Sequence, residues 1–103
     1  MEQNILKNKN CLITGATGGL GREISIELAK KGCNLFLTSK ESDLEDLKSK
    51  IEQFDSKISV MCQLTDLRNV DDVNLLINHV REKFSHIDIL INCAGENHRK
   101  PIA

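Results

Sequence analysis

The feature that most constrains this chain is a glycine-rich turn between a short apolar run and a helical pattern. The run ends at Ile13, and four glycines fall within residues 15–21. A tight turn needs a residue that tolerates unusual φ, and a helix crossing close to its strand needs a small one. A strand, a glycine turn and a helix in this order present unpaired amides and the positive end of a helix dipole to an anion.

Glycine-rich turns also occur as ordinary connections between a strand and a helix, so the turn alone does not identify a site. A P-loop is excluded, because that motif requires Gly-Lys-Ser/Thr after four intervening residues. Here Arg22 and Glu23 follow Gly21.

Strand and helix patterns alternate along the whole chain. Strands are expected at 10–14, 33–38, 58–62 and 87–92, with helices at 19–31, from Ser42 onward to Phe54, and at about 68–84. Ser42 and Glu45 have the spacing of a capping box, and Gly32 marks the end of the first helix. This βαβαβαβ pattern predicts an α/β fold: a parallel sheet of strand order 3-2-1-4 with helices on both faces. Ligands of such sheets bind beyond the carboxyl ends of the strands, at the switch point between strands 1 and 4.

All three predicted helices carry apolar residues at helical spacing, and core packing is the ordinary explanation. In the second helix these are Leu44, Leu47, Ile51 and Phe54. The expected buried residues are Leu20, Ile24, Leu28 and Ala29 in the first helix, and Val70, Val73, Leu76, Ile77, Val80 and Phe84 in the third.

Composition excludes several classes of partner. The 103 residues suffice for one domain, 1–103, and the 14 basic and 15 acidic residues nearly balance. Three Phe and no Trp or Tyr leave no stacking platform, so nucleic acid is not an expected partner. Residues 1–10 are polar and no apolar run approaches membrane-spanning length, so we expect a cytoplasmic protein with no membrane contact.

The cysteines and histidines do not have the spacing of a metal site or a disulfide framework. Cys11, Cys33, Cys62 and Cys93 lie in or at the ends of predicted strands, where we expect them to be buried, unreactive thiols. The three histidines, His79, His86 and His98, are expected on the surface.

The segment after the second predicted strand bears on cofactor choice. Dinucleotide sites place an acidic residue here for the ribose 2′-OH of NAD, or a basic one for the 2′-phosphate of NADP. The chain has Ser39 and Lys40 with no acidic residue before Glu41, which favours NADP, with NAD possible. The same observation argues against the interpretation as a methyltransferase, because the ribose diol of S-adenosylmethionine generally requires a carboxylate here.

Two segments together resemble motifs of the short-chain dehydrogenase/reductase family. Residues 14–21 match its TGxxxGxG, and Asn92 to Gly95 resemble its NNAG after the corresponding strand. The glycines also fit the TGxxGxxG of the extended, epimerase-like branch, but the NNAG-like segment favours the compact reductase branch. The resemblance covers nearly the whole chain and implies a Rossmann-like fold, a nicotinamide dinucleotide and oxidoreductase activity.

The resemblance also implies roles for individual residues. The pyrophosphate and adenosine ribose would be lined by Gly15, Thr17, Gly18, Gly19, Leu20 and Gly21. Ser39 and Lys40 would face the 2′ position, Gln63 and Leu64 would lie beside the adenine, and Asn92, Ala94 and Gly95 would flank the adenosine and brace the sheet.

Three positions depart from the family pattern. Gln63 stands where Asp is usual, although its amide oxygen could still accept from an amino group. Cys93 replaces the second Asn, with packing as its expected role. Gly18 occupies a position that is basic in many NADP-preferring members, which tempers the preference for NADP.

The catalytic Asn, Ser, Tyr and Lys of the family lie beyond the matched segments, and this chain has no Tyr. We therefore expect an N-terminal, cofactor-binding part of an NADP(H)-dependent oxidoreductase of the carbonyl or 3-oxoacyl reductase type, without catalytic residues of its own. The alternative is a short protein that binds only nucleotide or a partner chain. The fourth strand would be an exposed edge, which predicts self-association of this chain and a homo-oligomer at full length.

Overall fold

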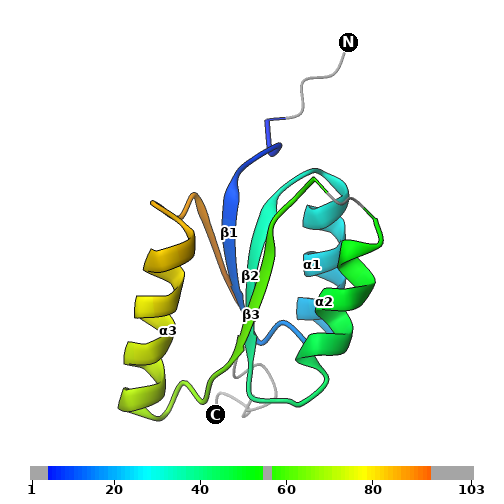
Figure 1. Cartoon of the computed structure of the whole chain (residues 1–103). Coiled ribbons are helices and arrows are strands. Elements are labelled where there is room, and N and C mark those ends of the chain that lie inside the picture. Colours follow the sequence, from blue (N-terminus) through cyan, green and yellow to red (C-terminus); the bar gives the residue numbers. More distant parts are fainter. Residues whose placement is uncertain (1–4, 55–56, 94–103) are drawn as a thin grey trace, which may run out of the picture.

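Strands and helices alternate along the chain in the computed structural model, which describes residues 5–54 and 57–93 (Figure 1). The strands are β1 (Asn10–Thr14), β2 (Asn34–Ser39), β3 (Val60–Leu64) and β4 (Ile89–Asn92). The helices are α1 (Gly19–Lys30), α2 (Leu44–Glu52) and α3 (Val70–Lys83). All strand pairs are parallel and the order is β3-β2-β1-β4, which confirms the predicted fold class and strand order.

β3 and β4 begin two residues later than the sequence pattern indicates, and β2 begins one residue later, at Asn34. β4 begins at Ile89, and the residue before it, Asp88, contacts Asn10 twice: its amide donates to the Asn10 carbonyl (2.8 Å) and its side chain accepts from the Asn10 amide (2.8 Å). β3 begins at Val60 and continues to Leu64, and the Thr65 amide then extends the pairing to the Ser39 carbonyl (2.9 Å). Both strands therefore reach the carboxyl edge of the sheet, where ligands of this fold class bind.

The ends of α1 follow the sequence signals. The helix begins at Gly19 and ends at Lys30, and Gly32 follows with a φ of 86°, a left-handed conformation that suits glycine. The Gly32 amide donates to the Ala29 carbonyl (3.0 Å), so the predicted helix stop is confirmed.

The predicted capping box at the start of α2 is wrong. The residue before the helix is Asp43 rather than Ser42, and its side chain makes no capping hydrogen bond. An ion pair with Arg22 of α1 (3.2 Å) occupies the Asp43 carboxylate instead. Tertiary contact has replaced the local bond that the sequence pattern suggested.

The sheet has a core on each face. Figure 1 shows α1 and α2 against one face and α3 against the other. Alternation along β2 sends Leu35 and Leu37 toward α1 and α2, and sends Phe36 toward α3. The larger core also contains Cys11, Ile13, Ala29, Leu44, Leu47 and Ile51, whereas Phe36 packs with Leu76, Val80 and Phe84.

The predicted apolar stripes are only partly buried. Leu20 is 58% exposed, because α1 turns its small residues Gly21, Ser25 and Ala29 toward the sheet. In α3, Leu76 and Val80 are buried, whereas Val70 and Ile77 are 72% and 43% exposed. Close packing of α1 selects small residues, which an apolar-periodicity argument does not detect.

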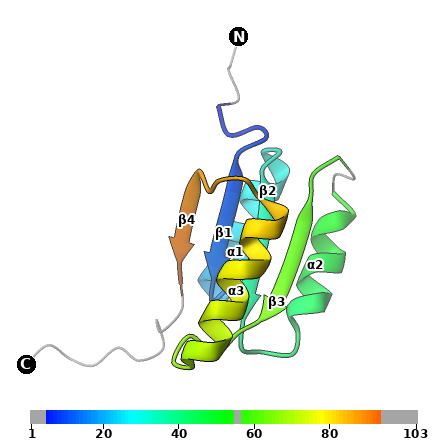
Figure 2. The same ribbon diagram turned by 60° about the vertical axis from the view of Figure 1, so that its left-hand side comes forward.

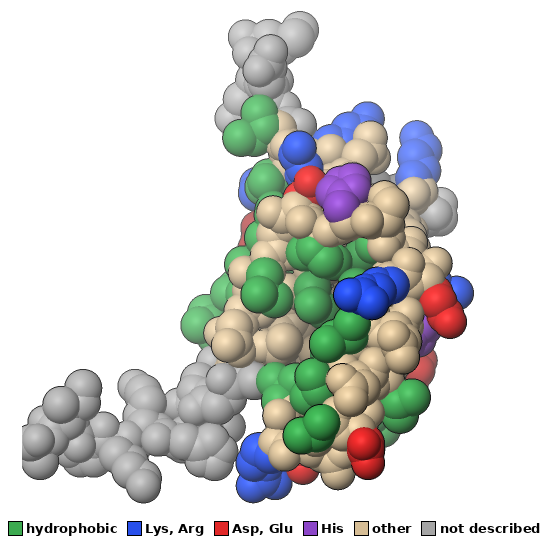
Figure 3. Space-filling view, turned by 90° about the vertical axis from the view of Figure 1, so that its left-hand side faces the viewer, with side chains coloured by type: hydrophobic (Ala, Val, Ile, Leu, Met, Phe, Trp, Pro, Cys, Tyr) green, Lys and Arg blue, Asp and Glu red, His purple; other side chains and the backbone are tan. Residues whose placement is uncertain are grey.

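Exposed apolar side chains continue from α3 toward the edge strand. β4 lies at the edge of the sheet beside β1, as Figure 2 shows. Leu90 in this strand is 62% exposed, and Figure 3 shows apolar side chains spread over this face of the molecule. Among the helices of the described residues, none is both long and apolar enough to cross a bilayer.

Phe36 is the only fully buried aromatic side chain in the described part of the chain, and its removal tests the smaller core. Phe36→Ala should lower the free energy of unfolding by about 3–5 kcal/mol, through lost transfer energy and a cavity between β2 and α3. Urea denaturation followed by circular dichroism measures this change. The matched variant Phe54→Ala, at a 43% exposed side chain, should cost much less; equal losses at both positions would contradict the packing described here.

Candidate functional site

The glycine turn places three backbone amides at the start of α1. Gly15 has a φ of 63°, and Gly18 is the extended residue before the helix and supplies no side-chain cap. The first hydrogen bond of the helix runs from the Arg22 amide to the Gly18 carbonyl (2.8 Å). The amides of residues 19–21 come before this bond and have no acceptor within the helix. These amides and the helix dipole suit an anionic group such as a pyrophosphate.

The space around the turn depends on glycine at two positions in different ways. A Cβ at Gly21 would collide with the Gly15 carbonyl oxygen, so Gly21 lets α1 pack directly on the turn. A Cβ at Gly19 would meet nothing within 4 Å, so the space outside this residue is open. The turn therefore combines a tightly packed inner side with an open outer side, which fits a phosphate group that approaches the backbone.

The end of β2 is joined to the glycine turn by hydrogen bonds. The Ala16 amide donates to the Thr38 carbonyl (3.1 Å), and the hydroxyls of Thr17 and Ser39 lie 2.8 Å apart. Ser39 is buried, and its hydroxyl also accepts from the Glu41 amide (3.1 Å). Ser39 thus shapes the loop, whereas the neighbouring Lys40 is exposed and its charge is available to a ligand.

An ion pair that the sequence analysis did not anticipate lies beside this loop. Arg22 in the first turn of α1 contacts Asp43 before α2 at 3.2 Å. The other Asp43 oxygen, Oδ1, is buried and has no hydrogen-bond partner among the described residues. The sequence signal was weak, because Arg22 and Asp43 are far apart in the chain and both read as surface charges.

Gln63 and Leu64 at the end of β3 occupy different surroundings. The Gln63 side-chain oxygen lies 2.6 Å from Nδ1 of His79 in α3, and the His79 ring meets the buried Phe36 edge-on at 4.9 Å. His79 is therefore half-buried, not on the surface as predicted. Leu64 is 56% exposed at the carboxyl edge of the sheet.

The first two residues of the NNAG-like segment, Asn92 and Cys93, lie at the carboxyl ends of β1 and β4. The Thr14 hydroxyl donates to the Asn92 side-chain oxygen (2.6 Å), and the Cys93 amide donates to the Thr14 carbonyl (3.0 Å). These bonds join the two strands at the switch point of the sheet. Ala94 and Gly95 lie outside the described residues, so their role in flanking the adenosine stays a prediction.

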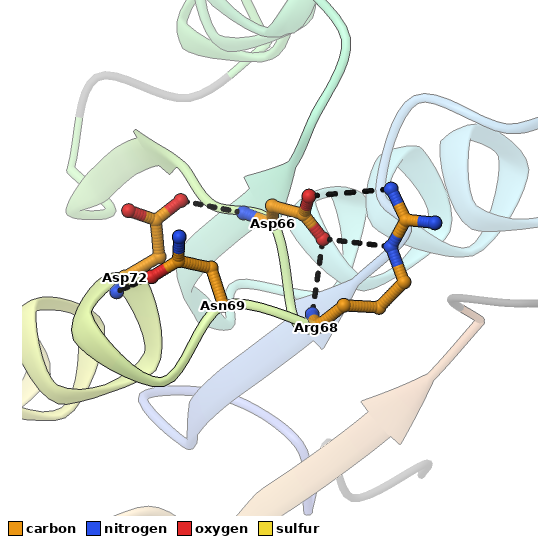
Figure 4. Close-up of polar contacts among 4 residues, drawn as sticks. All are labelled: Asp66, Arg68, Asn69 and Asp72. Carbon is orange, nitrogen blue, oxygen red and sulfur yellow. Dashed lines mark hydrogen bonds and ion pairs between the residues drawn. The ribbon is translucent and has the colours of Figure 1, made fainter.

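The loop between β3 and α3 is ordered by its own polar side chains, as Figure 4 shows. Asp66 accepts from the backbone and the guanidinium of Arg68, and these bonds hold the pKa of Asp66 below its ordinary value. Asn69 accepts from the Asp72 amide (3.0 Å) and caps α3, while Asp72 accepts from the Asp66 amide (3.0 Å). The positive charge of Lys40 also acts on Asp66, which brings the ends of β2 and β3 into one electrostatic environment.

The cysteines are free thiols, and the structure supports the expected low reactivity for three of them. Burial raises the pKa of Cys11 to about 12 and also raises that of Cys33. Cys62 is only partly buried, but burial and its hydrogen bond to Glu45 (3.1 Å) raise its pKa to about 12 as well. These thiols stay protonated at neutral pH, which makes them poor nucleophiles.

The contact between Gly21 and Gly15 gives a direct test of the turn. Gly21→Ala should lower the free energy of unfolding by about 1–3 kcal/mol, because the added methyl group forces α1 away from the turn. Gly19→Ala should be neutral or stabilising by up to about 1 kcal/mol, because its Cβ enters open space in a helix. Chemical denaturation of both variants measures the difference, and equal behaviour would contradict the geometry of the turn.

Comparison with known proteins supports the same interpretation. A model of the short chain dehydrogenase family matches residues 9–103. A fatty acyl-CoA reductase of Acinetobacter baylyi is 33% identical over 99 residues, covering 94% of this chain and 32% of that protein. General stress protein 39 of Bacillus subtilis is 33% identical over 97 residues, covering 92% of this chain and 33% of that protein.

Solved structures share the fold. L-sorbose reductase from Gluconobacter frateurii, complexed with NADPH and L-sorbose, has a TM-score of 0.82 and 27% identity, covering 91% of this chain and 36% of that one. An NADH-dependent reductase complexed with NAD has a TM-score of 0.74 and 32% identity, covering 86% of this chain and 37% of that one. The chain thus spans about a third of the length of these relatives. With its parallel sheet, its glycine turn and a family match from residue 9 to residue 103, the chain belongs to the short-chain dehydrogenase/reductase family.

Proposed function

We propose that this chain forms the dinucleotide-binding part of a short-chain oxidoreductase that uses NADP(H). The observation that carries the proposal is the start of α1, where no side chain caps the amides that precede the Arg22 amide and where the space beside Gly19 is open. In a protein of the length of its relatives, the reaction would be hydride transfer between the cofactor and a carbonyl or hydroxyl substrate. A 3-oxoacyl thioester is one substrate of this class.

The residues of this chain would bind and orient the cofactor. The pyrophosphate would lie on the amides at the start of α1, and the adenosine would extend along the carboxyl edge past β2 toward β3. When bound, the nicotinamide supplies or accepts the hydride. Protonation of the substrate oxygen requires an acid, a role that the family resemblance gives to a Tyr, and the chain has none.

The preference for NADP rests on Lys40. Its exposed ammonium group follows β2, while the hydroxyl of the adjacent Ser39 is already engaged by Thr17 and Glu41. A 2′-phosphate would gain a charge-assisted contact from Lys40, and the 2′-OH of NAD would not. Solved relatives include one complexed with NADPH and one complexed with NAD, so the family membership leaves this choice to the residues after β2.

A second candidate function is that of a binding module that associates with another chain. The observation that favours it is the exposed apolar surface of the edge strand, where Leu90 is 62% exposed. An unpaired strand edge with an apolar face readily pairs with a further strand. The two functions make different predictions and are compatible in one protein.

Titration calorimetry of the chain with NADPH, NADH and S-adenosylmethionine tests the first function. We expect NADPH to bind more tightly than NADH and S-adenosylmethionine not to bind. Lys40→Asp should reverse the order of the two dinucleotides, with an NADPH affinity lower by roughly tenfold or more, because a charge-assisted hydrogen bond becomes a repulsion.

Lys9→Asp is the control for this experiment. Lys9 precedes β1, at the opposite edge of the sheet, and its replacement makes the same change in net charge. This variant should keep the NADPH preference of the unmodified chain. A ratio of NADPH to NADH affinity that is unchanged by Lys40→Asp would refute the role of Lys40, whereas failure of both dinucleotides to bind would refute the proposed function itself.

Self-association through the edge strand is tested by light scattering during gel filtration. The mass of the chain should rise with its concentration, and Leu90→Lys should reduce this rise, because a charge on an edge strand disfavours pairing. Leu75→Lys makes the same exchange at a 61% exposed residue of α3. Association that responds to Leu75→Lys but not to Leu90→Lys would place the contact on the helix and contradict pairing at β4.

A further inference from the structure

Both oxygens of Gln63 are engaged by neighbouring side chains. Its backbone carbonyl accepts from the Thr38 hydroxyl (2.8 Å) on the paired strand β2. Its side-chain oxygen, Oε1, lies 2.6 Å from Nδ1 of His79. An amide oxygen can only accept, so this contact assigns the proton to Nδ1 of His79.

His79 is held in place from two sides. It projects from α3, and its ring meets the Phe36 ring edge-on, with centroids 4.9 Å apart and planes at 88°. Phe36 is fully buried in the core between β2 and α3. The Gln63 amide is therefore oriented by a ring that the core itself positions.

This orientation leaves the amide nitrogen as the available end of the side chain. Oε1 and Nε2 lie on opposite sides of the terminal carbon, so an oxygen turned to His79 turns Nε2 away from it. Within residues 5–54 and 57–93, Nε2 of Gln63 has no hydrogen-bond partner. Gln63 is next to the last residue of β3, at the edge where the adenine is proposed to lie.

We propose, on the basis of the dinucleotide site described above, that Gln63 presents a hydrogen-bond donor to the purine of the cofactor. The sequence alone had suggested an acceptor for the exocyclic amino group of adenine. With Oε1 taken by His79, the side chain instead matches an acceptor on the purine edge. A 6-oxopurine carries an acceptor where adenine carries a donor, so the site accepts a hypoxanthine dinucleotide at least as well as the adenine form.

The test compares two ligands that differ only on one edge of the purine: adenine has an amino group at C6 and an acceptor at N1, whereas hypoxanthine has an oxo group at C6 and a donor N–H at N1. Calorimetry measures the affinities of the chain for nicotinamide adenine dinucleotide phosphate and nicotinamide hypoxanthine dinucleotide phosphate, both oxidised and both carrying the 2′-phosphate that the proposed site prefers. The unmodified chain should bind the hypoxanthine form with equal or higher affinity. Gln63→Glu keeps one oxygen for His79 and offers the other as an acceptor, so it should shift the ratio toward adenine by roughly tenfold.

His79→Leu tests the orienting contact. Leucine keeps an apolar contact with Phe36 and removes the donor, so Oε1 is free to accept from adenine and the ratio should shift toward adenine by about threefold. Asn74→Leu, at an exposed residue of the same helix, is the matched control and should leave the ratio unchanged. Circular dichroism of each variant establishes that it is folded. If His79→Leu does not fold, Gln63→Glu carries the test.

The outcomes separate this inference from the function on which it rests. Binding of both dinucleotides with a clear preference for adenine in the unmodified chain would overturn the role of Gln63 and leave the cofactor site intact. A ratio that neither Gln63→Glu nor His79→Leu changes would do the same. Binding of neither dinucleotide would contradict the proposed function, and the inference with it.

Discussion

The rest of the structure depends on the direct contact between α1 and the turn that precedes it. Gly21 packs against the Gly15 carbonyl so closely that no Cβ fits between them. This contact fixes the start of the helix over the carboxyl end of β1, where no side chain caps the first amides and the space beside Gly19 is open. A larger residue would tilt the helix away, and the anion site and the packing of Ala29 on the sheet would both be lost.

The two faces of the sheet are stabilised to different extents. α1 and α2 cover one face with a continuous apolar core, whereas α3 covers the other through a smaller cluster around Phe36. Beyond β1 the α3 face continues to β4, where Leu90 is exposed. An apolar face of this kind costs free energy in water, which favours its association with another chain. The proposed cofactor site lies at the carboxyl edge of the sheet, so cofactor binding and association can belong to one molecule.

Hydrogen bonds within the protein decide which groups at the carboxyl edge are available to a ligand. The Ser39 hydroxyl and the Gln63 side-chain oxygen, both expected to face the cofactor, are bound to Thr17 and His79. The groups that remain available to a ligand are the amides of the glycine turn, the Lys40 ammonium and the Gln63 amide nitrogen. The chemistry of the site is therefore that of a set of donors and positive charge, which complements phosphates and purine acceptors.

The sequence by itself determined the fold class, the strand order, the position of the glycine turn and the stop of α1 before Gly32. These features depend on local periodicity and on backbone conformations that few residues adopt, so they are visible in the order of residues. Only the tertiary structure decided that Asp43 pairs with Arg22 instead of capping α2, that α1 buries Ser25 instead of Leu20, and that His79 orients Gln63. Each of these outcomes depends on how a helix packs against the sheet or against another element, which the local order of residues does not determine.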